Sequence, residues 1–168
     1  AYDTNSNRVV IAYGDATNYY GKAVVGTVSG GGVSFGTPVV FNSAMTTSIQ
    51  PNHSIAFDSN SNKVVIVYKD NGNSNQGTAI VGNVDPSNNS ISFGGETVFE
   101  TGHTTHPVVA FDSSNNKVLI SFKDYDDSQR GKAIVGTISG TSISFGSAAQ
   151  FSSSSTSLLS TVFDSSNN

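Results

Sequence analysis

Three copies of one sequence pattern follow one another along the chain, and this repetition constrains the fold more than any other feature. The segment that begins at Ala1 recurs at Ala56 and Ala110 as an aromatic residue and an aspartate, small polar residues, a basic residue and a β-branched run. A Gly-x-Ala-x-Val-Gly block and a Ser-Phe-Gly block follow in the same order each time. Self-similarity at a period of about 50 residues is the signature of a repeat architecture.

The repetition sets the predicted domain organisation. We place repeat 1 at residues 1–55, repeat 2 at 56–109 and repeat 3 at 110–161, with the start of a fourth copy at 162–168. Repeat 1 lacks the strand that precedes the aspartate in the other copies. Together the repeats form one repeat domain or a segment of a longer array. The copies differ in length at 85–89 and after Phe41, Phe99 and Phe151, where we expect loops because insertions cost least there.

Each repeat has the pattern of four short strands. In repeat 3 the apolar or alternating runs 107–111, 117–122, 131–138 and 142–151 are separated by clusters of Asp, Asn, Ser and Gly, which are typical of turns. No window shows the helical period of about 3.6 residues. The sequence therefore predicts an all-β fold of tandem four-stranded antiparallel meanders.

This unit resembles the β-propeller-type repeats of secreted bacterial and bacteriophage surface proteins, in which an aromatic-Asp turn precedes Lys-Val and a hydrophobic strand. In repeat 2 the motif is Phe57-Asp58 followed by Lys63-Val64. The resemblance implies propeller-like blades, three per chain, at the surface of a cell or virion. A β-solenoid or a string of small sandwiches has the same strand pattern and stays an alternative.

Three blades are fewer than the roughly four or more that closed propellers have. We therefore expect the ends to be completed by strand exchange between copies, giving a two-chain ring or a head-to-tail filament, or by a longer array of which these residues are an excerpt. The strand that repeat 1 lacks matches residues 158–163. Leu158, Leu159, Val162 and Phe163 form this candidate assembly strand.

Composition excludes several classes of function. Only 12% of the residues are charged, and 8 Lys and Arg stand against 12 Asp and Glu, which argues against a nucleic-acid-binding surface. The chain has no Cys, so it has neither a disulfide framework nor a thiolate metal site. It also has no apolar stretch of the roughly 18 residues that a membrane-spanning helix needs. We expect no nucleic-acid partner and no membrane insertion.

Two aspartate turns carry a weak calcium signal. Asp3 with Asn5, and Asp58 with Asn60, have the alternating oxygen ligands that open a calcium loop. Neither run has the following Gly or the distal Glu of such a loop. A hairpin turn stabilised by the aspartate is the better interpretation. We expect neither a metal nor a cofactor.

A second set of polar residues is a candidate ligand site. An aspartate recurs after the second strand of each repeat, and loop tyrosines, which could stack on sugar rings, accompany it in repeats 1 and 3. These residues are Asp15, Asp70, Asp124, Tyr19, Tyr20 and Tyr125. Strand-end turns that use an acid are the simpler explanation. Asn52 and Asn88 fit the N-glycosylation pattern, which matters only in a compartment that glycosylates.

These features lead to one functional hypothesis and two alternatives. The near-identical repeats and the low-charge Ser, Thr and Asn surface favour a non-enzymatic extracellular structural or adhesive protein that self-associates into a filament, ring or surface appendage. A carbohydrate-binding, lectin-like propeller is the alternative. A glycoside hydrolase ranks third, because hydrolysis needs one specialised pair of carboxylates and the acids here are interchangeable between repeats.

Overall fold

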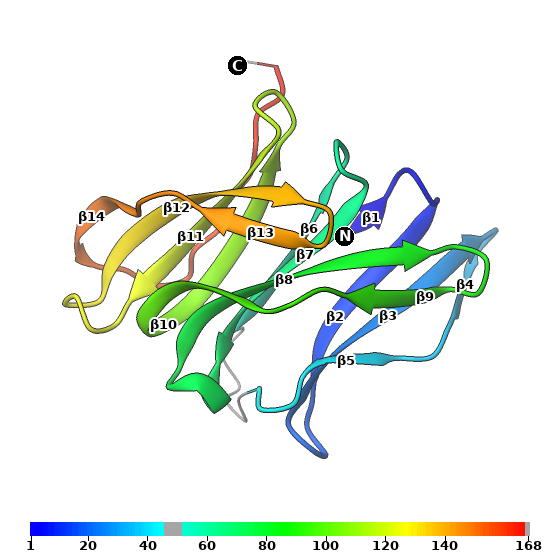
Figure 1. The fold of residues 1–168 in the computed structure, drawn as a ribbon, viewed down its shortest axis with the longest axis horizontal. Helices are drawn as coiled ribbons and strands as arrows, with labels where there is room; N and C mark the ends of the chain where they lie inside the picture. Colours follow the sequence, from blue (N-terminus) through cyan, green and yellow to red (C-terminus); the bar gives the residue numbers. More distant parts are fainter. Residues whose placement is uncertain (46–51, 167–168) are drawn as a thin grey trace.

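The structure, a computed structural model, describes residues 1–45 and 52–166 (Figure 1). Within those ranges it consists of strands, their connections and one 3-10 turn, η1 (Asn71–Asn73). The strands are β1 (Tyr2–Asp3), β2 (Arg8–Asp15), β3 (Tyr20–Ser29), β4 (Gly32–Phe35), β5 (Val39–Asn42), β6 (His53–Asp58), β7 (Lys63–Asp70), β8 (Gln76–Asp85), β9 (Ser90–Phe93), β10 (Thr97–Asp112), β11 (Lys117–Asp124), β12 (Arg130–Ser139), β13 (Ser142–Phe145) and β14 (Ala149–Ser155). The paired strands are antiparallel, which confirms the predicted all-β antiparallel fold.

The strands form a five-stranded sheet and a nine-stranded sheet; the second changes partners within β10, so we describe the chain as three units with the same order of pairing. Unit 1 is β1-β2-β3-β4 with β5 also beside β3. Unit 2 is β6-β7-β8 with β9 and residues 97–103 of β10 beside β8. Unit 3 is residues 104–112 of β10, then β11, β12, β13 and β14. The register is also the same, because Val9, Val64 and Val118 each face a glycine of the third strand.

β10 belongs to two units. Its first part pairs with β8 and its second part with β11, so one strand links unit 2 to unit 3 (Figure 1). Register shifts occur between Glu100 and His103 and between Thr105 and Val108. Such bulges bend a strand, so that it leaves one sheet and joins another. The sequence repeats of 56–109 and 110–161 therefore begin inside the first strand of units 2 and 3.

The aspartate motif of each repeat closes the turn between the first two strands. The Asp58 carboxylate accepts hydrogen bonds from the backbone N–H groups of Asn60 and Ser61 and from the Ser61 hydroxyl. Asp3 and Asp112 make the same two backbone contacts in units 1 and 3. The last turn residue in each unit is an asparagine with φ between 54° and 56°. Asparagine tolerates this left-handed conformation, which explains why the motif recurs.

The units stack face to face, because each sheet has two apolar faces. In unit 2, we define the leading face by Val64, Ile66 and Tyr68, and the trailing face by Val65 and Val67, which point the other way along the same strand. All five side chains are fully buried. The equivalent positions in units 1 and 3 carry the same face names.

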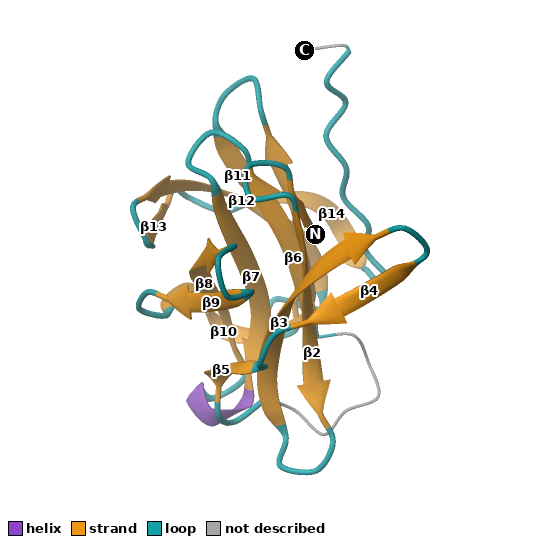
Figure 2. Cartoon of the chain, turned by 90° about the vertical axis from the view of Figure 1, so that its right-hand side faces the viewer, coloured by secondary structure: helices purple, strands orange, loops and turns teal. Residues whose placement is uncertain are grey.

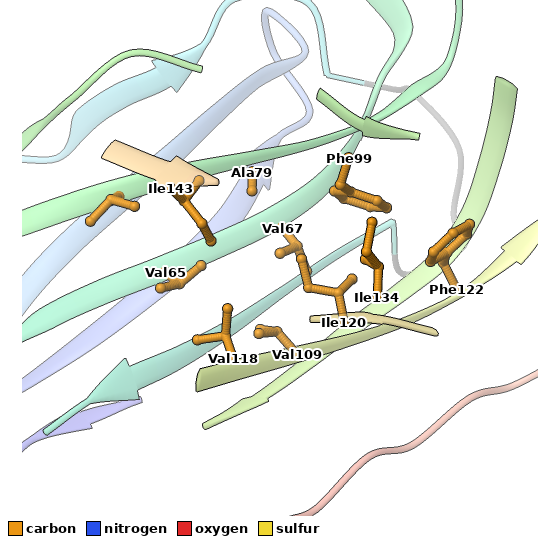
Figure 3. Close-up of a cluster of buried hydrophobic side chains, with 11 residues drawn as sticks. Val65, Val67, Ala79, Phe99, Val109, Val118, Ile120, Phe122, Ile134 and Ile143 are labelled. Atoms are coloured by element: carbon orange, nitrogen blue, oxygen red, sulfur yellow. The ribbon is translucent and has the colours of Figure 1, made fainter. Parts of the chain in front are cut away.

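Two apolar clusters fill the spaces between the units. The trailing face of unit 1, with Val10, Val25 and Phe41, packs against the leading face of unit 2. The trailing face of unit 2, with Val65, Val67 and Phe99, packs against Val118, Ile120 and Phe122 on the leading face of unit 3 (Figure 3). The same type of contact therefore occurs twice in succession. Within residues 1–45 and 52–166, no unit covers the leading face of unit 1 or the trailing face of unit 3.

Candidate functional site

The leading face of unit 1 exposes several side chains whose equivalents in units 2 and 3 are buried or half-buried, while Val24 on the same face is buried. Ile11 is 44% exposed, whereas Ile66 and Ile120 at the same position in the other units are fully buried. Phe35 is 52% exposed, whereas Phe93 and Phe145 are half-buried and pack against the clusters between units. The exposed large apolar side chains of this face are Tyr2, Ile11, Val28, Val33 and Phe35. They form one continuous side of a sheet rather than scattered surface residues.

The trailing face of unit 3 is the opposite end of the stack. Phe151 is 54% exposed, whereas Phe99 at the same position of unit 2 is 7% exposed. Val135 is exposed and Leu119 is half-buried on the same face. A groove of about 400 Å³ crosses this face; its lining includes Ala110, Leu119, Val135, Val162 and Phe163.

The candidate assembly strand lies against this end of the molecule. Residues 158–163 form no strand in the structure and are drawn as a loop (Figure 2). The Thr161 hydroxyl donates a hydrogen bond of 2.9 Å to the Ser121 hydroxyl. Leu158 and Val162 are 79% and 87% exposed. Leu158 has φ 55°, close to the φ of 53° at His106, its equivalent at the start of the first strand of unit 3.

The first strand of unit 1 is correspondingly short. β1 pairs with only Val9 and Arg8 of β2, whereas β6 pairs with six residues of β7. Among the described residues, no strand pairs with residues 11–15 of β2 on the β1 side. The His53 ring nitrogen Nε2 lies 3.2 Å from the Ala12 carbonyl oxygen. Beyond Val10, this edge of β2 is therefore paired with no described strand, and His53 contacts one of its carbonyls.

The three strand-end acids lie in three different units, and each is engaged by its own unit. Lys22 donates a hydrogen bond to Asp15, and this bond holds the pKa of the Asp15 carboxyl below its usual value. Lys132 donates in the same way to Asp124, at 2.6 Å. Asp70 accepts from the backbone N–H of Gly72 at the start of η1. These contacts are those of strand-end turns, and the structure does not bring the acids together.

Unit 2 has no lysine at this repeat position: Thr78 is the equivalent of Lys22 in unit 1 and of Lys132 in unit 3. Asp70 is 4% exposed, and no salt bridge involves it among the described residues. The buried Thr78 hydroxyl has no hydrogen-bond partner among the described residues.

A polar network beside Asp70 joins units 1 and 2. The Tyr68 hydroxyl donates to Glu96 Oε1 at 2.6 Å, and Asn42 Nδ2 donates to the same oxygen at 3.0 Å. Burial, and then the hydrogen bond to Glu96, raise the pKa of Tyr68. Asn42, Asp70 and Glu96 line a cavity of about 640 Å³. Sequence reasoning missed Glu96, although a single carboxylate where the other repeats have Pro38 and Ala148 is a signal that could have identified it.

The loop tyrosines are separated in the same way as the acids. Tyr19 lies in the turn between β2 and β3 and is 48% exposed, and Tyr20 begins β3. Tyr125 follows β11 and stacks on the His103 ring, with ring centroids 4.6 Å apart. Tyr19 and Tyr20 therefore belong to unit 1 and Tyr125 to unit 3.

The remaining candidates are explained locally. Both oxygens of Asp3 and of Asp58 accept hydrogen bonds within their own turns. In the part of the chain that the structure describes, no group of three or more His, Asp or Glu could hold a metal ion. Of the two glycosylation patterns, Asn52 is buried and Asn88 is exposed in the turn between β8 and β9. Over residues 1–45 and 52–166, no helix is long and apolar enough to cross a membrane.

No family model matches the chain, and the searches of curated proteins and of solved structures found no match either.

Proposed function

We propose that this protein is a non-enzymatic structural repeat protein that acts by self-association, with its three units serving as propeller-like blades. One observation carries the proposal: the leading face of unit 1 exposes apolar positions that are buried between units elsewhere in the same chain. A sheet face of this kind is stable when another sheet covers it. The surface that covers such a face, the trailing face of the preceding unit, occurs twice in the same chain.

The size of the face supports this function. Burying a large aliphatic or aromatic side chain contributes about 1.5–3 kcal/mol. Five such side chains are partly exposed on one side of unit 1. Single exposed apolar residues are ordinary, but a contiguous patch marks an interaction surface. Residues 11–15 of β2 pair with no described strand on the β1 side, and residues 158–163 of another copy occupy the repeat position of the strand that fills this edge in unit 2.

We place this assembly outside the cell, or on the surface of a cell or virion, as a structural or adhesive component. The support is the low-charge surface rich in Ser, Thr and Asn and the resemblance of the repeats to those of surface proteins. The non-enzymatic assignment rests on the strand-end acids. Asp15 and Asp124 are paired with lysines of their own unit, as turn residues are.

Sedimentation velocity over a range of protein concentrations tests the proposal. We expect the mass of the particle to rise with concentration. Phe35→Asp, which places a charge in the leading face of unit 1, should leave the protein monomeric. Tyr19→Asp is the matched control, because Tyr19 is equally exposed but lies in a turn outside that face. A wild-type protein that stays monomeric at every concentration contradicts the proposal.

Carbohydrate binding is the second candidate, favoured by the cavity between units 1 and 2. Its carboxylates, Asp70 and Glu96, and the Asn42 amide have the hydrogen-bonding groups that sugar hydroxyls require. A glycan array probed with wild-type protein and with Glu96→Ala tests this function. Binding that Glu96→Ala abolishes would support it, and a blank array would remove it.

A further inference from the structure

We propose that the trailing face of unit 3 is the acceptor for the leading face of unit 1 of a second copy, with the β3–β4 hairpin of that copy crossing over Gly146. This inference rests on the proposed self-association and names the partner surface. It commits to a head-to-tail contact between different faces of two copies.

At both contacts between units, the backbone of a hairpin turn lies very close to a glycine of the preceding unit. A side chain added at Gly36 in unit 1 would overlap the backbone carbonyl of Asn89, in the turn between β8 and β9 of unit 2. A side chain added at Gly94 in unit 2 would overlap the carbonyl of Thr141, in the turn between β12 and β13 of unit 3. The hairpin of each unit thus lies directly on a glycine of the unit before it.

Gly146 is the equivalent glycine of unit 3, and no other unit in the described part of the chain lies over it. The nearest atom to an added Cβ is the Val135 carbonyl oxygen of its own unit, at 3.9 Å. The equivalent of Asn89 and Thr141 in unit 1 is Gly31, in the turn between β3 and β4. An added Cβ at Gly31 would meet no atom within 4 Å. Both halves of this hairpin-on-glycine contact are therefore open in the chain.

The trailing face of unit 3 and the leading face of unit 1 also match chemically. Leu119, Val135 and Phe151 on the trailing face of unit 3 repeat the aliphatic and aromatic character of Val65, Val81 and Phe99 in unit 2. In unit 2 these residues bury Phe111, Val118 and Ile143 of unit 3. The corresponding residues of unit 1 are Tyr2, Val9 and Val33.

The apolar groove marks where part of this contact falls. Its walls include Leu119 and Val135, and Phe163 closes one side. Thr161 holds the neighbouring segment against Ser121. That segment lies beside the first strand of unit 3, so it would also lie beside residues 11–15 of β2 in the docked copy. The groove, the open glycine and this edge of β2 therefore agree on one placement.

When two copies join in this way, one leading face of unit 1 and one trailing face of unit 3 remain free on the pair. Such a heterologous contact closes into a ring or continues as a filament. A ring of two copies would contain six units, a number within the range of about four to eight blades seen in propellers.

The experiment compares variants on the two faces, first alone and then mixed. Gly146→Arg places a long side chain under the incoming hairpin, yet its Cβ would meet only the Val135 carbonyl oxygen, at the ordinary contact distance of 3.9 Å. Gly95→Arg is the matched control, since Gly95 is surrounded by open space but lies outside the proposed contact. Circular dichroism and thermal melting verify that each variant is folded before its association is measured.

We expect Gly146→Arg to weaken self-association by about tenfold to a hundredfold, the effect of overpacking a close contact, and Gly95→Arg to leave it unchanged. An equimolar mixture of Gly146→Arg and Phe35→Asp should form one-to-one pairs. The intact leading face of Gly146→Arg docks on the intact trailing face of Phe35→Asp. The pairs do not grow further, because each of the two remaining faces carries a substitution.

Two results overturn the inference in distinguishable ways. If Gly146→Arg self-associates as strongly as wild type, face-to-itself pairing of unit 1 replaces the head-to-tail contact, and the proposed self-association survives. If the wild-type protein does not associate at all, both the inference and the proposed function are wrong. Should Gly146→Arg fail to fold, Val135→Asp on the same exposed face is measured in its place.

Discussion

Ile11, Ile66 and Ile120 occupy the same repeat position, so replacing each of them tests how much burial between units contributes to stability. Ile66 and Ile120 are fully buried between units, whereas Ile11 in unit 1 is 44% exposed. Replacing a buried isoleucine by alanine costs about 2–5 kcal/mol, because the lost transfer free energy adds to that of the cavity left behind. For a chain of this length that corresponds to a decrease in melting temperature of about 4–20 °C. Ile11→Ala leaves no enclosed cavity and should cost about 1 kcal/mol or less in the monomer.

Differential scanning calorimetry of the three variants at low protein concentration checks this order. In dilute solution Ile66→Ala and Ile120→Ala should each melt well below wild type, and Ile11→Ala close to it. At high concentration the self-associated form should become sensitive to Ile11→Ala, because association completes the burial of that side chain. An Ile11→Ala variant that destabilises the dilute monomer as much as Ile66→Ala would refute the reasoning that its face is uncovered.

Three further predictions concern the polar network, the assembly strand and pH. Tyr68→Phe should lower the free energy of unfolding in urea by about 1.5–3 kcal/mol, because it removes a hydrogen bond to the Glu96 carboxylate. Phe122→Tyr, at the same position of unit 3, should also destabilise the protein, because the side chain of Ala148, which stands at the position of Glu96, offers no acceptor for the new hydroxyl. A chain that ends at Thr156 should show weaker self-association in sedimentation equilibrium, because it lacks residues 158–163. Burial lowers the pKa of His53, so the unfolded chain binds the proton at higher pH than the folded one. The stability due to neutral His53 is therefore complete above the ordinary histidine pKa of about 6.5 and is lost as pH falls through the lowered value; urea unfolding of His53→Gln should show a flatter pH dependence.

The strand pattern was predictable because each strand has its own local signals. Asp58 and Asn62 close a turn by contacts within five residues, so the sequence alone identifies that turn. The continuous apolar run from Val64 to Tyr68 is typical of a strand that is buried on both faces. The stacking of the sheets follows from this two-sided burial, although the choice of which faces meet depends on long-range packing.

The strand β10 was not predictable in the same way. The sequence predicts a loop after Phe99, because the copies differ in length there. The structure makes residues 100–106 strand because bulges let the segment change its partner from β8 to β11. A partner change of this kind is decided by the two neighbouring sheets. Nothing within the segment itself signals it.

Apolar stacking alone does not determine which units meet. The leading face of unit 3, with Ile120 and Phe122, is as apolar as that of unit 2, so hydrophobic burial would allow unit 1 to cover either. The polar network distinguishes them, because Asn42 of unit 1 is buried and its amide needs the Glu96 carboxylate of unit 2. Against unit 3, the same amide would meet Ala148 and remain unpaired, at a cost of about 1–3 kcal/mol.

The trailing face of unit 3 has no such requirement. Ser152 stands at the position of Asn42, and its hydroxyl already donates to the Ser154 carbonyl of its own strand. The unit that covers this face therefore needs no carboxylate, and unit 1, which has Pro38 at the position of Glu96, meets that condition. Unit 2 does not, because its Glu96 would lose the Asn42 amide on leaving unit 1. The same network that fixes the order of units within a chain thus leaves unit 1 as the one suited to the contact between copies.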